Sequence, residues 1–139
     1  MNDLEQARSF FAGDRFATEC TGAVIQEVSP GHAVCTAEIR PCHCNAMGKP
    51  MGGMIYTLAD FAFAAASNFK QAPKVTLTSQ ITYLSAARGH TLTAVADVVR
   101  SGRSTCFYQI DVRDELGTHV AYVTTSGFTV GEAPAEKAD

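Results

Sequence analysis

Asp60 is the only charged residue of an apolar segment, and its carboxyl group is the strongest candidate for chemistry in this 139-residue chain. Between Met54 and Ser67 the other residues are almost all Met, Ile, Leu, Phe and Ala, with Tyr56 and Thr57 as polar exceptions. An ionised carboxylate in such a place is unfavourable unless it is paired, protonated or used. Asp60 could act as a general base or a nucleophile. The alternative is a buried aspartate that bonds backbone or hydroxyl groups.

The apolar segment is predicted to be a helix at roughly residues 53–69, because a helix that is apolar on all sides is buried on all sides. Residues 2–12 predict a short amphipathic helix, with Asn2 or Asp3 as its N-cap and Gly13 at its end. Residues 41–53 lack periodicity and predict a loop.

Period-two patterns indicate six strands, two before the central helix and four after it. The first two are separated by the turn signal Ser29-Pro30-Gly31. The last four have glycines in their separators, and their spacing suits an antiparallel meander. The predicted strands are 21–29, 32–40, 74–84, 91–100, 106–113 and 119–130.

This order of elements predicts an α+β fold, in which a curved antiparallel sheet of about six strands wraps one central helix. We expect one domain over residues 1–139, with its core at about 15–130 and a frayed polar tail at 131–139. Several strands are long and have polar outer faces, so extra burial is expected from dimerisation.

Composition narrows the class of protein. The net charge of −3 disfavours nucleic acid as a partner, and 46% hydrophobic residues are enough for a substantial core. No signal-peptide pattern is present, and the apolar stretch is too short to span a bilayer. An odd number of cysteines without a regular framework suits reduced thiols. These features predict a cytoplasmic protein that binds neither nucleic acid nor membrane. The cysteines are Cys20, Cys35, Cys42, Cys44 and Cys106.

The run Cys42-His43-Cys44 resembles part of a metal site. Two ligands in a C-x-C pattern need two further ligands at suitable spacing, and none is evident. Neighbouring residues do not generally face each other, so a Cys–His nucleophile pair is no better supported. The sequence therefore predicts no metal and no other cofactor.

The loop-to-helix segment, together with the order of elements, resembles the hotdog fold and, within it, the PaaI-like acyl-CoA thioesterases. The family pattern is an Asn, a Gly, His-Gly-Gly opening the helix, and Leu-Ala-Asp inside it. Segments 80–84, 99–103 and 116–121 also resemble the family, and the resemblance covers about 15–130. The matching residues, at agreeing spacing, are Asn45, Gly48, Met51-Gly52-Gly53 and Leu58-Ala59-Asp60. Met51 stands where the family has His.

The resemblance implies a site shared by two subunits. Gly52 and Gly53 would present free N–H groups at a helix N-terminus, where they form an oxyanion hole for a thioester carbonyl. The alternative is a tight loop-to-helix turn. Gly52 and Asp60 lie about 12 Å apart on a straight helix, too far to act on one carbonyl carbon. A homodimer, or a dimer of dimers, would bring Asp60 of one chain towards Gly52 of another.

Two more positions are candidates for catalysis. Asn45 could orient water or the thioester, or it could merely satisfy its own loop. Thr78 follows Asp60 by eighteen residues, where similar thioesterases often place a Ser or Thr that positions water. Ser79 is its rival, and an ordinary strand threonine is the alternative.

Substrate binding would fall to two further groups. Arg88, Arg100 and Arg103 flank turns and could bind the phosphates of CoA, although arginines at turns are usually just solvated. The acyl group would lie against apolar and aromatic residues that could equally be plain core, and the aromatics allow an aryl acyl group. These residues are Met51, Met54, Tyr56, Leu58 and Phe61.

The prediction is a thioesterase that hydrolyses an acyl- or aryl-CoA to the free acid and CoA. A non-catalytic acyl-CoA-binding or sensing protein is the main alternative, and Met51 favours it while Asp60 argues against it. A hydratase or dehydratase of the same fold is a second alternative, but it typically pairs a catalytic His with a carboxylate, and that His is missing here.

Overall fold

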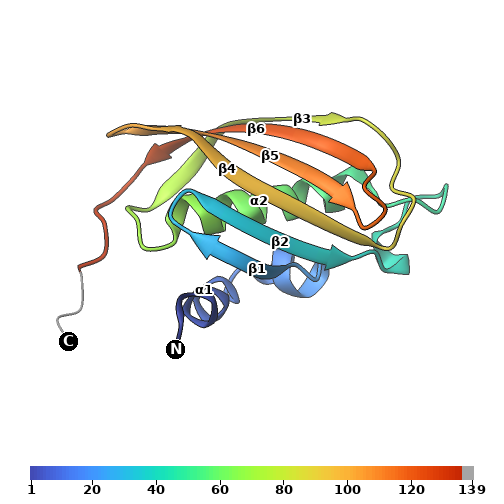
Figure 1. Cartoon of the computed structure of the whole chain (residues 1–139), viewed down its shortest axis with the longest axis horizontal. Helices are drawn as coiled ribbons and strands as arrows, with labels where there is room; N and C mark the ends of the chain where they lie inside the picture. The colour runs from blue at the N-terminus through green and yellow to red at the C-terminus, as the bar shows by residue number, and fades with distance from the viewer. Residues whose placement is uncertain (136–139) are drawn as a thin grey trace.

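The computed structural model describes residues 1–135, in which six strands form one antiparallel sheet around a long helix (Figure 1). This is the hotdog arrangement, so the predicted α+β fold is confirmed. In chain order the elements are α1 (Asp3–Phe11), a π-helical turn η1 (Phe16–Cys20), β1 (Val24–Ser29), β2 (His32–Glu38), a 3-10 turn η2 (Pro41–His43), α2 (Gly52–Asn68), β3 (Lys74–Tyr83), β4 (Thr91–Ser101), β5 (Thr105–Asp114) and β6 (His119–Thr129).

The sheet has the order β1-β2-β4-β5-β6-β3. The strands β4, β5 and β6 form the predicted meander, but β3 pairs with β6 and not with β4, so the prediction of a four-strand meander is wrong for β3. The spacing of the strands along the sequence could not reveal the partner of β3, because the link at 84–90 is long enough for either a hairpin to β4 or a crossover. As a result β3 lies at one edge of the sheet and β1 at the other.

The predicted strand and helix boundaries agree with the structure to within three residues. No residue pattern predicted η1, because a π-helical turn of five residues has no periodicity of its own. The predicted tail at 131–139 continues beyond the described residues, which end at 135.

The helix α1 starts with a capping box and covers the edge of the sheet at β1. The Asn2 side chain accepts the backbone N–H of Glu5, and the Glu5 carboxylate accepts that of Asn2. Arg8 Nε then donates to the backbone oxygen of Ile25 on β1, at 2.7 Å. An exposed edge strand can pair with another chain, so α1 protects this edge. The edge at β3 has no such cover from α1, which lies at the opposite side of the sheet (Figure 1).

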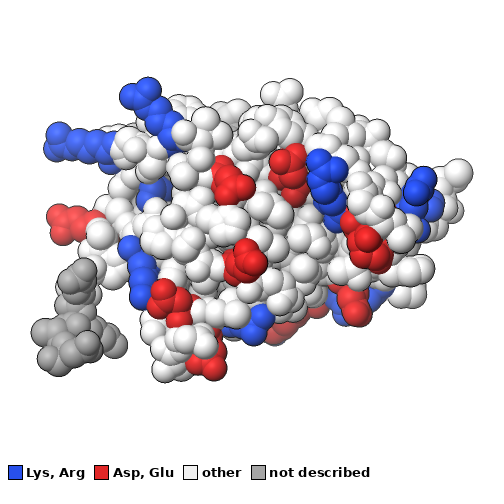
Figure 2. Space-filling view, viewed as in Figure 1, with Lys and Arg blue, Asp and Glu red and all other residues white. Residues whose placement is uncertain are grey.

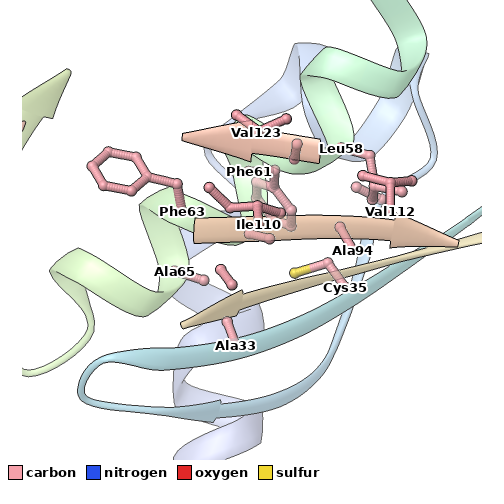
Figure 3. Packing of buried hydrophobic residues seen from close by; sticks show 14 of the residues in the cluster. Ala33, Cys35, Leu58, Phe61, Phe63, Ala65, Ala94, Ile110, Val112 and Val123 are labelled. Carbon is pink, nitrogen blue, oxygen red and sulfur yellow. The ribbon is translucent and has the colours of Figure 1, made fainter. Parts of the chain in front are cut away.

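The core lies between α2 and the concave face of the sheet (Figure 3). The strands β2 and β4 present small side chains to α2, which allows the helix backbone to approach them closely. Larger residues of α2 and of β5 and β6 fill the rest of the space, and Phe63 packs edge-to-face on Tyr108. The small residues on the two strands are Ala33, Cys35, Ala37, Ala94 and Ala96.

One stripe of α2 is not covered by the rest of the chain. The prediction of a helix buried on all sides is therefore wrong for the single chain. The stripe runs through Gly53, Tyr56, Thr57, Asp60 and Ala64, which are all partly or fully exposed. Their spacing of three or four residues puts them on one face of the helix. The carboxyl group of Asp60 therefore lies at a boundary between core and solvent.

Charged side chains of both signs are scattered over the face on which the sheet lies in front of α2 (Figure 2). No continuous basic tract is visible on this face, which agrees with the net charge of −3. Within residues 1–135, every helix is too short or too polar to cross a membrane.

Candidate active site

The helix α2 begins at Gly52 without a side-chain cap. Met51 precedes it with an extended backbone (φ −64°, ψ 148°) and its side chain makes no capping hydrogen bond. The first N–H groups of an α-helix have no intrahelical partner, so those of Gly52 and Gly53 stay free and carry the positive end of the helix dipole. Gly53 is exposed. A negatively charged oxygen could be stabilised at this point.

Tyr83, at the end of β3, shapes the start of α2. Its hydroxyl group donates to the Gly52 carbonyl at 2.8 Å. A Cβ atom at Gly52 would lie only 2.6 Å from the Tyr83 hydroxyl oxygen, whereas one at Gly53 would meet nothing within 4 Å. A side chain at 52 would therefore displace the Tyr83 hydroxyl group, while one at 53 would meet open space. Burial raises the pKa of Tyr83, and the neighbouring Tyr56 phenol adds to this effect.

Asp60 lies two turns further along α2 and lines a cleft of about 300 Å³. No side-chain hydrogen bond to Asp60 is formed within residues 1–135. Burial raises the pKa of Asp60, and the negative charge of Asp14 raises it further. The lining residues are Asp14, Arg15, Phe16, Ala17, Tyr56, Thr57, Asp60, Phe61 and Ala64.

The free N–H groups and the free carboxyl group lie on the same helix, and Asp60 follows Gly52 by eight positions. At about 1.5 Å per residue they are about 12 Å apart along the axis. Reacting atoms have to approach within about 3–3.5 Å, so within one chain these groups cannot act on the same carbonyl carbon.

Asn45 organises its own loop. Its side-chain oxygen accepts the backbone N–H of Met47 at 2.9 Å and of Lys49 at 3.2 Å. Its backbone N–H donates to the Lys49 carbonyl at 2.7 Å. The Asn45 side chain is exposed, and its amide nitrogen is not used in these bonds. Asn45 therefore positions the loop that leads into α2 and keeps one donor group for another partner.

The register of β3 separates the two hydroxyl candidates. Thr78 pairs with Ser126, whose side chain is on the outer face of the sheet, and Thr78 shares that face. Ser79 pairs with the buried Thr125, its hydroxyl oxygen lies 3.0 Å from that of Thr125, and it faces α2. A β-bulge between Thr76 and Thr78 sets this register, and sequence alone could not locate it.

The candidates for acyl contact are divided between cleft, core and surface. Tyr56 and Phe61 line the cleft beside Asp60. Met54 and Leu58 are buried in the core, and the side chain of Met51 is 55% exposed at the start of α2. The structure therefore brings two of the five beside Asp60 and leaves Met51 near the free N–H groups.

The three arginines lie at opposite ends of the sheet. Arg100 and Arg103 flank the β4–β5 hairpin, whereas Arg88 precedes β4. The strand of eleven residues between these ends is about 35 Å long, so within one chain they cannot bind the same phosphate group. Arg88 shares its end with Lys49, whose amine donates to the carbonyl of Ala87 at 3.2 Å.

His43 is held in place by backbone groups of its own loop and of the segment at Cys20. Its Nδ1 accepts the backbone N–H of Arg40 at 3.0 Å, so Nε2 carries the proton and donates to the Cys20 carbonyl at 2.8 Å. Both ring nitrogens are thus engaged. Among the described residues no group of three or more His, Cys, Asp or Glu is arranged to hold a metal ion.

Sequence reasoning missed three residues around the site: Asp14, Phe16 and Tyr83. Asp14 and Phe16 reach the cleft through η1, and Tyr83 reaches Gly52 from the end of β3. Each is distant in sequence from Asp60. Only Tyr83 falls in a segment that resembles the family, 80–84, and the resemblance assigned no role to it. Alternate residues of a strand lie on the same face, and Tyr83 follows Ser79 by four positions in β3. Only this spacing could have indicated that Tyr83, like Ser79, faces α2.

Comparison with known proteins identifies the family and supports the fold. The family model described as "Thioesterase superfamily" matches residues 47–121. The acyl-coenzyme A thioesterase PaaI of Escherichia coli is 29% identical over 128 residues, which is 91% of either chain. Human acyl-coenzyme A thioesterase 13 is 30% identical over 94 residues, 66% of this chain and 67% of the human protein.

Solved structures extend the likeness over nearly the whole chain. The structure of Escherichia coli PaaI has a TM-score of 0.86 at 26% identity and covers 94% of this chain and 96% of its own. A hypothetical thioesterase protein of Streptococcus pneumoniae, solved with coenzyme A, has a TM-score of 0.81 at 27% identity, with coverage of 89% of this chain and 99% of its own. The sequence match, the shared fold and the conserved order of helix and strands lead to one conclusion: this chain belongs to the thioesterase superfamily and is one of its PaaI-like members.

Proposed function

We propose that this protein is an acyl-CoA thioesterase, which hydrolyses an acyl- or aryl-CoA to the free acid and CoA. The observation that carries the proposal is the pairing of two unsatisfied features on α2: the unbonded carboxyl group of Asp60 in its cleft and the free N–H groups of Gly52 and Gly53. The names of the relatives and the coenzyme A in the Streptococcus pneumoniae structure support the choice of an acyl-CoA substrate.

In the proposed site, Asp60 of one subunit and Gly52 and Gly53 of its partner act on one thioester. Their separation of about 12 Å within a chain requires a second chain. The open edge of the sheet supports a dimer, because β3 and the residue after it carry large exposed apolar side chains that a second chain could cover. These side chains are Val75, Leu77, Tyr83 and Leu84.

Two routes use the same groups. As a general base, the Asp60 carboxylate removes a proton from water while the water oxygen attacks the thioester carbon. As a nucleophile, the carboxylate attacks that carbon itself and gives an acyl-enzyme anhydride, which water then hydrolyses. In both routes the negative charge on the carbonyl oxygen is held by the N–H groups of Gly52 and Gly53, which contributes about 3–4 kcal/mol in well-studied cases.

The carbon–sulfur bond breaks when this oxyanion collapses. On the nucleophile route this happens as the anhydride forms, before water hydrolyses it, and CoA leaves as a thiolate that takes a proton from water. On the general-base route, the proton held by Asp60 passes to the departing sulfur. Asn45 and a hydroxyl group of β3, Thr78 or Ser79, would orient water. Ser79 is the better placed of the two, because it faces α2. The arginines Arg88, Arg100 and Arg103 would bind phosphates of CoA, at opposite ends of the sheet or in different subunits.

The test is the release of free thiol from a panel of short, medium and aryl acyl-CoAs. We expect turnover by the wild type and its loss in Asp60→Asn. A protein that binds acyl-CoA tightly without turnover would instead be a binding or sensing protein, which the Met51 substitution favours.

The shared site has its own test. Asp60→Ala should be inactive and a Gly52 variant less active than the wild type, and mixing their subunits should raise the activity above that of either variant alone. One of the two sites in such a mixed dimer combines an intact Asp60 with an intact Gly52. If refolded mixtures are no more active than the Gly52 variant alone although mixed dimers form, the shared site is wrong.

A further inference from the structure

The cleft beside Asp60 has one wall that comes from the N-terminal segment of the same chain. Asp14, Arg15, Phe16 and Ala17 form this wall, at the start of η1, and α2 forms the opposite wall. The segment contributes an acidic group at the rim, because Asp14 is exposed to solvent. Two carboxyl groups, Asp14 and Asp60, therefore share one small cleft.

The single basic residue of the cleft does not neutralise this pair. Arg15 Nε and one terminal guanidinium nitrogen bond the two carboxylate oxygens of Glu19, at 2.7 and 3.0 Å. Glu19 does not line the cleft. Bidentate bonding of this kind uses the fork of the guanidinium group, so Arg15 is occupied by a partner of its own. The charge that remains at the cleft is negative.

The other lining groups are neutral and mostly apolar. Phe16, Ala17, Phe61 and Ala64 offer carbon surfaces, and the hydroxyl group of Thr57 is used in a 2.8 Å bond to the Gly53 carbonyl. A volume of about 300 Å³ is at the small end of ligand pockets. Such a cleft suits a small or medium acyl group with an apolar body.

We propose that Asp14 is a specificity-determining residue, which makes the cleft accept uncharged acyl groups and reject acyl groups that end in a carboxylate. A carboxylate entering the cleft would approach Asp14 and Asp60 together, and like charges at close range are unfavourable. This inference rests on the proposed thioesterase function, because it assigns the acyl group to the cleft beside Asp60. Asp14 acts by its charge and takes no part in bond breaking.

Butyryl-CoA and succinyl-CoA test the proposal, since both acyl groups have four carbons and only succinyl carries a terminal carboxylate. We expect the wild type to favour butyryl-CoA in kcat/KM by about tenfold or more. Asp14→Asn should narrow this preference by about three- to tenfold, mainly through a lower KM for succinyl-CoA. The wild-type preference should also narrow in high salt, because Asp14 is at an exposed rim.

Two variants act as controls. Asp14→Glu keeps the negative charge and should keep the preference. Asp3→Asn removes a carboxylate from the same N-terminal segment, where Asp3 pairs with Lys70 on the surface at 2.7 Å, and it should leave the preference unchanged. Matched melting temperatures of the variants would show that each is folded.

Binding of the non-hydrolysable thioether analogues of both compounds, measured by calorimetry, separates this proposal from the proposed function. If the wild type releases no thiol from either compound or from any member of the acyl-CoA panel, the thioesterase proposal fails, and the ratio of the two Kd values still decides the role of Asp14. An unchanged Kd ratio in Asp14→Asn would overturn the inference. A wild type that prefers the succinyl compound would overturn it as well, and would indicate that Arg15 leaves Glu19 to receive the carboxylate.

Discussion

The corner formed by the turns around Asp114, at the end of β5, and the helix α2 contain the same two kinds of group, a shielded carboxyl group and backbone N–H groups. The two regions differ in whether these groups bond each other. At the corner they satisfy each other, because the carboxyl group of Asp114 accepts four backbone N–H groups. On α2 they are apart, with the carboxyl group at Asp60 and the N–H groups at Gly52 and Gly53. The donors at the corner are Arg88 and Gly89, at 2.8 and 3.0 Å, and Leu116 and Thr118, at 3.0 and 2.8 Å.

The difference is visible in the ionisation of the two carboxyl groups. Burial alone raises the pKa of both. At Asp114 the backbone N–H groups outweigh burial and hold the pKa well below its usual range. At Asp60 the charge of Asp14 adds to burial. The fold thus stabilises the ionised form of Asp114 and leaves that of Asp60 unsatisfied, as in many catalytic carboxylates.

An aspartate-to-asparagine substitution should mainly lower activity at position 60 and mainly lower stability at position 114. The loss of activity in Asp60→Asn is the largest effect we expect. Asp60→Asn should lower kcat for acyl-CoA hydrolysis about 1,000-fold, since an amide neither accepts a proton from water nor attacks a thioester. Its melting temperature should stay the same or rise, because an unsatisfied charge is removed. Thiol release and thermal unfolding measure the two effects. A strongly destabilised Asp60→Asn would show that Asp60 has structural partners and would break the contrast with Asp114.

At the corner, Asp114→Asn should mainly lower stability. The amide keeps one acceptor oxygen, so two of the four N–H groups lose their partner, and Arg88 and its neighbours in the 84–90 link are loosened. We expect a melting temperature lower by roughly 5–10 °C at pH 7, while kcat per folded molecule stays within about threefold. A large loss of kcat in a fully folded variant would instead assign Asp114 to the active site.

The dependence of this loss on pH has a definite sign. Because the pKa of Asp114 is lower in the folded chain, the ionised group contributes stability at every pH above its unfolded pKa of about 4. That contribution is lost as the pH falls from there through the folded pKa. The difference in melting temperature between wild type and Asp114→Asn should therefore be constant near neutrality and shrink below about pH 4.

The fall of kcat/KM at acidic pH should follow the protonation of Asp60. In the proposed mechanism Asp60 works as a carboxylate, so kcat/KM should rise with pH through a pKa above the ordinary value for aspartate. The charged or titratable groups that line the cleft with it are Asp14, Arg15 and Tyr56. Removing the like charge in Asp14→Asn should move the acid limb to lower pH by a few tenths of a unit or more. If the acid limb of the pH profile does not move in Asp14→Asn, the charge of Asp14 is screened from Asp60.

Residue patterns were sufficient for the fold but only for part of the site. The apolar segment and the period-two strands each predicted one element, because local spacing determines which face of an element is buried. The position of β3 depends on which strand it pairs with, and the side on which Thr78 lies depends on a β-bulge; neither leaves a local signal. Asp60, Gly52 and Gly53 could be predicted as site residues from the sequence because they share one helix. Asp14 was missed because it reaches the cleft only through tertiary packing.

The smallest expected effects concern the two glycines that begin α2, and they test whether its N–H groups are kept free for a ligand. Gly53→Ala adds a methyl group where nothing lies within 4 Å, so the chain should fold normally and gain up to about 1 kcal/mol from better helix propensity. If a carbonyl group has to approach the Gly53 N–H group closely, the same methyl group should lower kcat/KM by about three- to tenfold.

Gly52→Ala is the matched control for packing, because its Cβ atom would displace the Tyr83 hydroxyl group and lower the melting temperature. A Gly53→Ala protein that is more stable yet less active would show that Gly53 serves activity and not folding. The variants Asp60→Asn and Asp114→Asn make the same distinction for the two carboxyl groups. Unchanged activity in Gly53→Ala would instead mean that α2 merely starts at this point, and the oxyanion hole would have to be sought in other N–H groups.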